Sequence, residues 1–116
     1  MSGVLPQRIR YENLRSLGFG SIGAGYTGVG TSFANPVRIL KVNNLTNANM
    51  IISFDGVNDM DVVAANAAYV FDYASNKEMP IGKLDQSTGD RLYVRQESSA
   101  PTSGNVYVTV VYASPN

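Results

Sequence analysis

The chain has 116 residues, nine Lys and Arg against nine Asp and Glu, and a charged fraction of 16%. This is the length of one domain, and the charged fraction lies below the roughly 25% of an ordinary soluble domain. Because the sequence holds no Cys, His or Trp, it excludes disulfides, Cys/His zinc sites and catalysis by a thiolate or an imidazole.

Residues 1–17 combine basic and apolar side chains. Arg8, Arg10 and Arg15 stand against Glu12 alone, with apolar residues interspersed. The spacing of Tyr11, Leu14 and Leu17 slightly favours a helical turn over a strand. We expect residues 1–17 to form an N-terminal arm that either pairs into a sheet or docks on a partner.

Residues 18–35 are rich in glycine, with six of the eleven glycines of the chain between positions 18 and 30. The pattern G-x-G-x-x-G occurs twice, starting at Gly18 and at Gly23. A dinucleotide site also needs a preceding strand, a helix that starts at the pattern and an acidic residue about 20 positions later. Asn43 stands at that position after Gly23, so we predict a loop or an edge strand and no cofactor.

From residue 36 the pattern is that of short strands rich in Val, Ile, Tyr and Phe, separated by Asn, Asp, Gly and Ser. With one or two strands from the preceding segments, about eight strands are expected. The sequence therefore predicts an all-β fold, a single jelly-roll-like antiparallel β-sandwich over residues 18–116, with an open barrel of the OB type as the alternative. The expected strands are 37–42, 50–54, 60–64, 68–73, 91–96 and 105–113.

The last of these strands is apolar on both faces. Val106, Val108 and Val110 alternate with Tyr107, Thr109 and Val111. Such a strand is either central and covered twice, or exposes one face to another subunit. With the arm, it supplies the candidate partner-binding residues, which are Val4, Leu5, Arg8, Arg10, Tyr11, Leu14, Arg15, Tyr107 and Val111.

The charge pattern favours protein partners. A net charge of zero offers no field to attract nucleic acid or an anionic membrane, and no apolar run reaches the roughly 18 residues of a membrane span. Residues 55–90 hold seven acids against two lysines, whereas the arm has an excess of two positive charges. Copies of the chain could meet arm to middle as a homo-oligomer, or the acids could form a solvated face.

The loop at residues 55–61 gathers three carboxylates and one amide, Asp55, Asn58, Asp59 and Asp61. This oxygen density is compatible with Ca²⁺, although the order of ligands is not that of an EF-hand. Turn chemistry explains Asp55-Gly56 and Asn58 without a metal, and we expect no metal site.

Catalysis is not expected, because the carboxylates are scattered at turns and no acid pair stands out. Carbohydrate binding by a β-sandwich module is an alternative of another class, because it uses exposed aromatic rings. The candidates are Tyr26, Tyr93, Tyr107 and Tyr112.

Two stretches carry a resemblance to a known class of protein. They are NNLTNANMIISFDGVNDMDVVAANAAYVFDYASNK at 43–77 and LYVRQESSAPTSGNVYVTVVYA at 92–113. They resemble small β-sandwich virion proteins of tailed bacteriophages. The resemblance implies a non-enzymatic protein at the capsid surface of a virion assembled in the host cytoplasm, where it decorates or cements the shell by binding the major capsid protein. A head-to-tail adaptor or tail component is the alternative, and no individual functional residue carries over.

Overall fold

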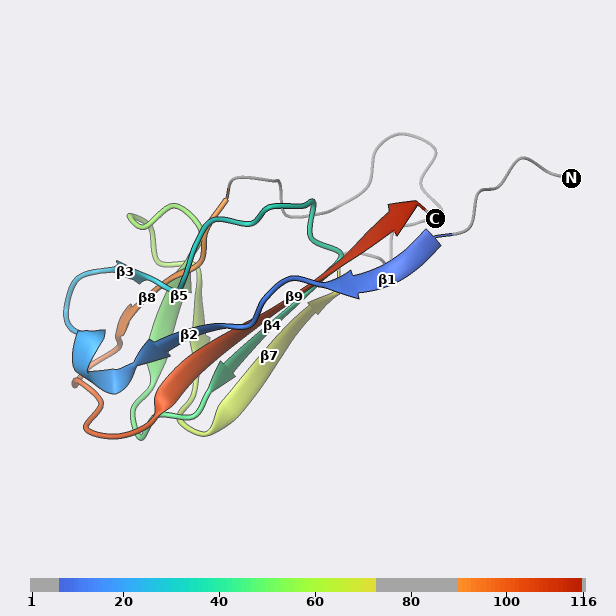
Figure 1. Ribbon diagram of the computed structural model, residues 1–116. Helices are drawn as coiled ribbons and strands as arrows, with labels where there is room; N and C mark the ends of the chain where they lie inside the picture. Colours follow the sequence, from blue (N-terminus) through green and yellow to red (C-terminus); the bar gives the residue numbers. More distant parts are fainter. Residues whose placement is uncertain (1–6, 73–89, 116) are drawn as a thin grey trace, which may run out of the picture.

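The computed structural model describes residues 7–72 and 90–115 (Figure 1). Within them the chain is almost entirely strand, with one short 3₁₀ helix, η1, at Phe19–Ser21. The strands are β1 Gln7–Tyr11, β2 Arg15–Gly18, β3 Thr27–Gly28, β4 Ile39–Asn44, β5 Met50–Ser53, β6 Asp61–Val63, β7 Ala67–Asp72, β8 Tyr93–Gln96 and β9 Asn105–Pro115.

The strands form two antiparallel sheets that pack as a sandwich. The larger sheet has the order β1-β9-β4-β7, and β2 also pairs with β9. The smaller sheet has the order β3-β8-β5-β6. Figure 1 shows β9 running the length of the larger sheet, with β1 and β2 on one side of it and β4 and β7 on the other. The predicted antiparallel sandwich is confirmed, with nine strands instead of about eight, whereas jelly-roll connectivity stays a prediction.

The helical interpretation of residues 11–17 is wrong, because this segment pairs with β9. Tyr11 lies opposite Val111 in β1, and Arg15 lies opposite Val108 in β2. Between these two pairs the N-terminal segment has three residues, 12–14, whereas β9 has two, 109 and 110. One extra residue on one strand of an antiparallel pair is a β-bulge. The bulge explains the misleading pattern, because an extra residue breaks the period-two alternation that identifies a strand. The predicted arm is thus an edge of the sheet from residue 7 onward.

The core lies between the two sheets. Val106, Val108 and Val110 of β9 are completely buried and lie opposite Asn44, Val42 and Leu40 of β4, respectively. Met50, Ile52 and Val94 cover them from the smaller sheet. Burial of each such side chain contributes about 1.5–3 kcal/mol. β9 is central in the sheet, because β1 and β2 pair with one of its edges and β4 with the other; its outer face is half-buried at Tyr107 and Thr109 and buried at Val111.

One buried polar side chain joins the two sheets. Asn44, at the end of β4, is fully buried. Its Nδ2 donates to the carbonyl oxygens of Ala48, Val63 and Ala64, and its Oδ1 accepts from the backbone N–H and the hydroxyl of Thr46. Because Val63 ends β6 of the smaller sheet, this amide fixes one sheet against the other.

The glycine-rich segment contributes η1 and β3, an edge strand of the smaller sheet, as the sequence predicts. Gly30 is the glycine that bears on the site described below. Its φ is +67°, and a Cβ there would lie 2.6 Å from Cγ of Arg15. Only glycine therefore lets this backbone pass beside the Arg15 side chain.

Candidate interaction site

The bulge between β1 and β2 places an acid and a base on the same side of the strand. Residues three apart in a regular strand point to opposite faces, but the extra residue of the bulge brings Glu12 and Arg15 together. The Nη2 of Arg15 lies 2.7 Å from Oε1 of Glu12, and each side chain is only 7% exposed.

The ion pair also holds the segment that follows the glycine-rich stretch. Arg15 donates from Nε to the carbonyl of Thr31 and from Nη2 to the carbonyl of Ser32, both at 2.9 Å. Its guanidinium carbon lies 5.4 Å from the centre of the Phe33 ring, a cation–π distance. Arg15 thus fastens residues 31–33 to the edge of the larger sheet.

The second carboxylate oxygen of Glu12 also bonds to the segment that follows residue 33. Its Oε2 accepts from the backbone N–H of Ala34 at 3.1 Å and from Nδ2 of Asn35 at 2.9 Å. Burial alone raises the pKa of Glu12, but the hydrogen bonds from Arg15, Asn35 and Ala34 outweigh it and hold the pKa below its ordinary value. The carboxylate is therefore ionised at neutral pH and satisfied within the protein.

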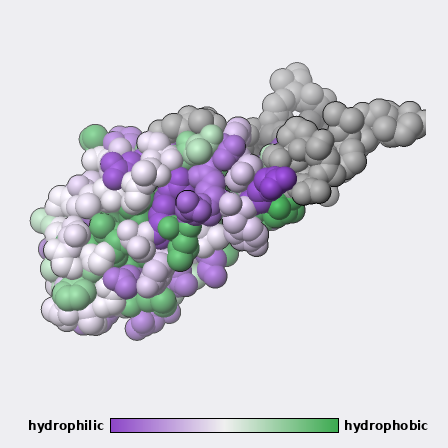
Figure 2. All heavy atoms as spheres, viewed as in Figure 1, coloured by the Kyte–Doolittle hydropathy of each residue, from purple (hydrophilic) through white to green (hydrophobic). Residues whose placement is uncertain are grey.

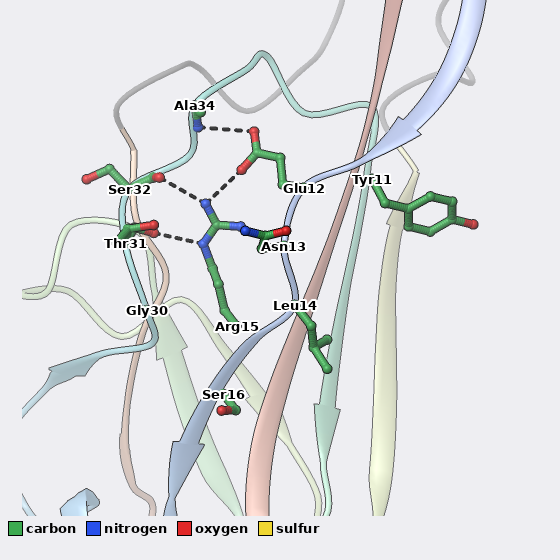
Figure 3. Close-up of a pocket in the computed structure, with 10 residues that line it drawn as sticks. All are labelled: Tyr11, Glu12, Asn13, Leu14, Arg15, Ser16, Gly30, Thr31, Ser32 and Ala34. Carbon is green, nitrogen blue, oxygen red and sulfur yellow. Dashed lines mark hydrogen bonds and ion pairs between the residues drawn. The ribbon is translucent and has the colours of Figure 1, made fainter.

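A hollow of about 570 Å³ lies over this pair (Figure 3). Figure 3 shows Glu12 and Arg15 pointing toward residues 30–34, whereas Tyr11 and Leu14 point away from that segment. Tyr11 is 69% and Leu14 61% exposed. Glu12 and Arg15 therefore bond within the protein, and the rim of the hollow is apolar at Tyr11 and Leu14.

The two ends of the predicted arm differ in what the structure shows of them. Val4 and Leu5 lie outside the described residues. The backbones of Arg8 and Arg10 lie in β1, opposite Ser114 and Tyr112.

Two of the predicted partner-binding residues are buried in the described structure. Arg15 is buried by its bonds to Glu12 and the 31–33 segment, and Val111 is 6% exposed in the middle of the sheet between β1 and β4. Tyr107 is half-buried. Among the members of the predicted set that the structure describes, Tyr11 and Leu14 are therefore the well-exposed apolar ones.

The acidic loop uses its oxygens for turn formation. Oδ1 of Asp55 accepts from the backbone N–H groups of Val57 and Asn58 and from the Ser53 hydroxyl. The bond from the Asn58 N–H, followed by those from Ser53 and Val57, holds the pKa of Asp55 well below its usual range. Asp59 forms a separate ion pair with Arg95 at 2.7 Å. Within residues 7–72 and 90–115, no three acidic side chains come close enough to hold a metal ion.

The four tyrosines considered for carbohydrate binding are half-buried. The guanidinium groups of Arg95 and Arg91 lie over the rings of Tyr26 and Tyr93, at 5.7 and 5.6 Å from their centres. These two rings therefore have a cation on one face, where a sugar ring would stack.

The sequence did not single out the Glu12–Arg15 pair. The signal was present as opposite charges three residues apart, but that spacing indicates a contact only on a helix or across a bulge. Among the described residues, no helix is long and apolar enough to cross a membrane. No protein-family model, curated protein or solved structure matches the chain.

Proposed function

We propose that this protein is a non-enzymatic structural subunit of a bacteriophage virion, which decorates or cements the capsid shell by binding the major capsid protein. The proposal rests on the sequence resemblance of residues 43–77 and 92–113 to small virion proteins. The structural observation that supports it is the bulged edge formed by β1 and β2, on which Ile9, Tyr11 and Leu14 are 67%, 69% and 61% exposed.

This edge has the chemistry of a docking surface. Figure 2 shows hydrophobic residues broken up by hydrophilic ones on this face of the molecule. Leu14 lies in the bulge and Tyr11 precedes it, and the Glu12–Arg15 pair holds the backbone there, so a partner does not have to order this backbone on binding. Burying a large apolar side chain contributes about 1.5–3 kcal/mol, so Ile9, Tyr11 and Leu14 would offset part of the roughly 4–15 kcal/mol that association costs.

The first test is the number of copies of this chain in purified virions, measured by quantitative mass spectrometry against the major capsid protein. A symmetric shell predicts on the order of hundreds of copies. About a dozen copies or fewer would instead indicate the head-to-tail adaptor or a tail component. Virions that lack the chain would contradict both.

A second test asks whether the bulged edge carries the contact. Deleting residues 1–17 is unsuitable, because it would remove two strands and the buried Arg15. Leu14→Asp places a charge on the rim of the hollow and is expected to lower occupancy on particles. Val57→Asp is the control, because Val57 is 77% exposed on the distant 55–61 loop. Unchanged occupancy for Leu14→Asp would assign the contact to another surface.

A further inference from the structure

We propose that copies of this chain associate head to tail, with β7 of one copy pairing with β1 of the next, so that the larger sheet continues from subunit to subunit. This inference goes beyond the proposed capsid contact, with which it shares Ile9 and Tyr11 of β1; substitutions at Leu14 and at Val70 distinguish the two contacts.

The two strands are the opposite edges of the larger sheet within the described residues. Directions alternate across the order β1-β9-β4-β7, since every pair is antiparallel. A copy added beside β7 in the same orientation therefore presents its β1 antiparallel to β7. The two strands have five and six residues, so they match in length.

The backbone groups at both edges have the right phase. The backbone N–H of Leu45 donates to the carbonyl oxygen of Asn105 in β9. Because backbone groups alternate in direction along a strand, the N–H and C=O of Asn43 and Lys41 also point toward β9. Val70 lies opposite Lys41, so its N–H and C=O point away from β4. By the same reasoning from the bond of Glu12 N–H to Val110 O, Ile9 directs its backbone away from β9.

The side chains agree with this pairing. Tyr11, Val111, Ile39 and Asp72 are paired across the four strands, so their side chains share the outer face of the sheet. Ile9 and Val70 lie two residues from Tyr11 and Asp72 and therefore point to the same face. Aligning the two strands over their full overlap sets Ile9 opposite Val70, which are 67% and 59% exposed. The segment Ala67–Phe71 has no charge, proline or glycine, the residues that usually protect an edge strand.

Charge distinguishes this contact from pairing of two identical edges. In the same alignment Arg10 lies opposite Tyr69, whose hydroxyl is 3.3 Å from Oδ1 of Asp61. Asp72 ends β7 on the outer face with Ile9, Tyr11 and Val70, so it lies on the other face of the sheet from Arg10. Two β1 edges paired about Ile9 would place Arg8 directly opposite Arg10, which is unfavourable for like charges, whereas Ala67–Phe71 of β7 offers β1 an uncharged partner strand. A second copy of the chain therefore fits the β7 edge.

The test is the mass of the purified protein as a function of concentration, by sedimentation velocity. We expect the wild type to form oligomers. Ile9→Pro and Val70→Pro each remove one N–H at an edge, and each is expected to raise the dissociation constant about tenfold or more. An equimolar mixture of the two keeps one intact edge of each kind and should form a dimer but nothing larger.

Ile9→Lys and Val70→Lys keep the backbone donors and serve as a second pair, should a proline prevent folding. Val62→Lys, on the edge strand β6 of the other sheet, is the matched control and should associate like the wild type. Leu14→Asp, which tests the capsid contact, should also leave the mass unchanged. The proposal is overturned by a monomeric wild type at about 1 mM, by either proline variant associating alone as tightly as the wild type, or by loss of association in Val62→Lys.

Discussion

Replacing Arg15 with methionine tests the central structural claim, that a buried ion pair holds the bulge and the 31–35 segment in place. Methionine keeps an unbranched apolar stem beside Gly30 but removes the guanidinium. The carboxylate of Glu12 then loses its cation at a buried position, because each side chain of the pair is only 7% exposed. The carbonyl groups of Thr31 and Ser32 lose their donors as well.

The expected cost follows from what remains. Breaking a buried ion pair by removing one partner costs about 3–5 kcal/mol, because the other charge stays buried. Glu12 keeps two donors, Ala34 N–H and Asn35 Nδ2, and Thr31 and Ser32 are exposed enough to bind water. Both facts place the loss at the lower end, about 3 kcal/mol. For a domain of this size that corresponds to about 10–15 °C in Tm.

Urea unfolding followed by circular dichroism measures this loss. Arg95→Met is the matched control, because Arg95 pairs with Asp59 at the same 2.7 Å on the surface, and its unfolding midpoint should stay close to that of the wild type. In Glu12→Gln with Arg15→Met, the combined loss should be smaller than the sum of the two. A loss under about 1 kcal/mol for Arg15→Met would refute the reasoning, since it would place the pair among surface ion pairs.

Three further predictions concern pH, a turn and the core. Because the pKa of Glu12 is lowered in the folded protein, the stabilisation from its carboxylate is present above the unfolded pKa of about 4.3 and is lost as pH falls through the folded pKa. Glu12→Gln should therefore reduce the slope of the free energy of unfolding against pH below about pH 4.3. An unchanged slope in acid titrations would contradict this. Gly104→Ala should lower the free energy of unfolding, measured in urea, by about 1–3 kcal/mol, because φ there is +90° and a Cβ would lie 2.0 Å from a carbonyl oxygen. Gly23→Ala is the control and should be close to neutral, because there is open space around Gly23. Asn44→Leu should lower the free energy of unfolding by about 2 kcal/mol or more, because it leaves buried carbonyl groups without donors, and a stability like that of the wild type would show that Asn44 does not join the sheets.

Several features of the fold could be predicted from the sequence, because they depend on local pattern. Runs of Val, Ile, Tyr and Phe predicted strands at 91–96 and 105–113, close to the observed β8 Tyr93–Gln96 and β9 Asn105–Pro115. Turn residues at 55–58 placed the loop after β5, where Asp55 accepts bonds from the following N–H groups. These signals lie within a few residues of one another, so no knowledge of the rest of the chain is needed.

The candidate site could be predicted only in part. The sequence marked Tyr11 and Leu14 as candidates, and both are well exposed. It also marked Arg15 and Val111, which are buried, because a basic side chain and a strand apolar on both faces are compatible with either environment. Burial depends on what covers a residue, and here residues 31–33 and the neighbouring strands provide that cover.

The sequence by itself determined that this chain is an all-β sandwich with a valine-rich core and turns at Asn, Asp and Gly, because alternation and turn chemistry are local properties. Only the tertiary structure decided that the N-terminal residues form a sheet edge, since their partner β9 lies about a hundred residues away along the sequence. The bulge that unites Glu12 with Arg15 exists only in the register against β9, and the two exposed edges exist only in the order of the strands. Pairing between distant segments creates these features, and no local pattern encodes which strand will lie beside which.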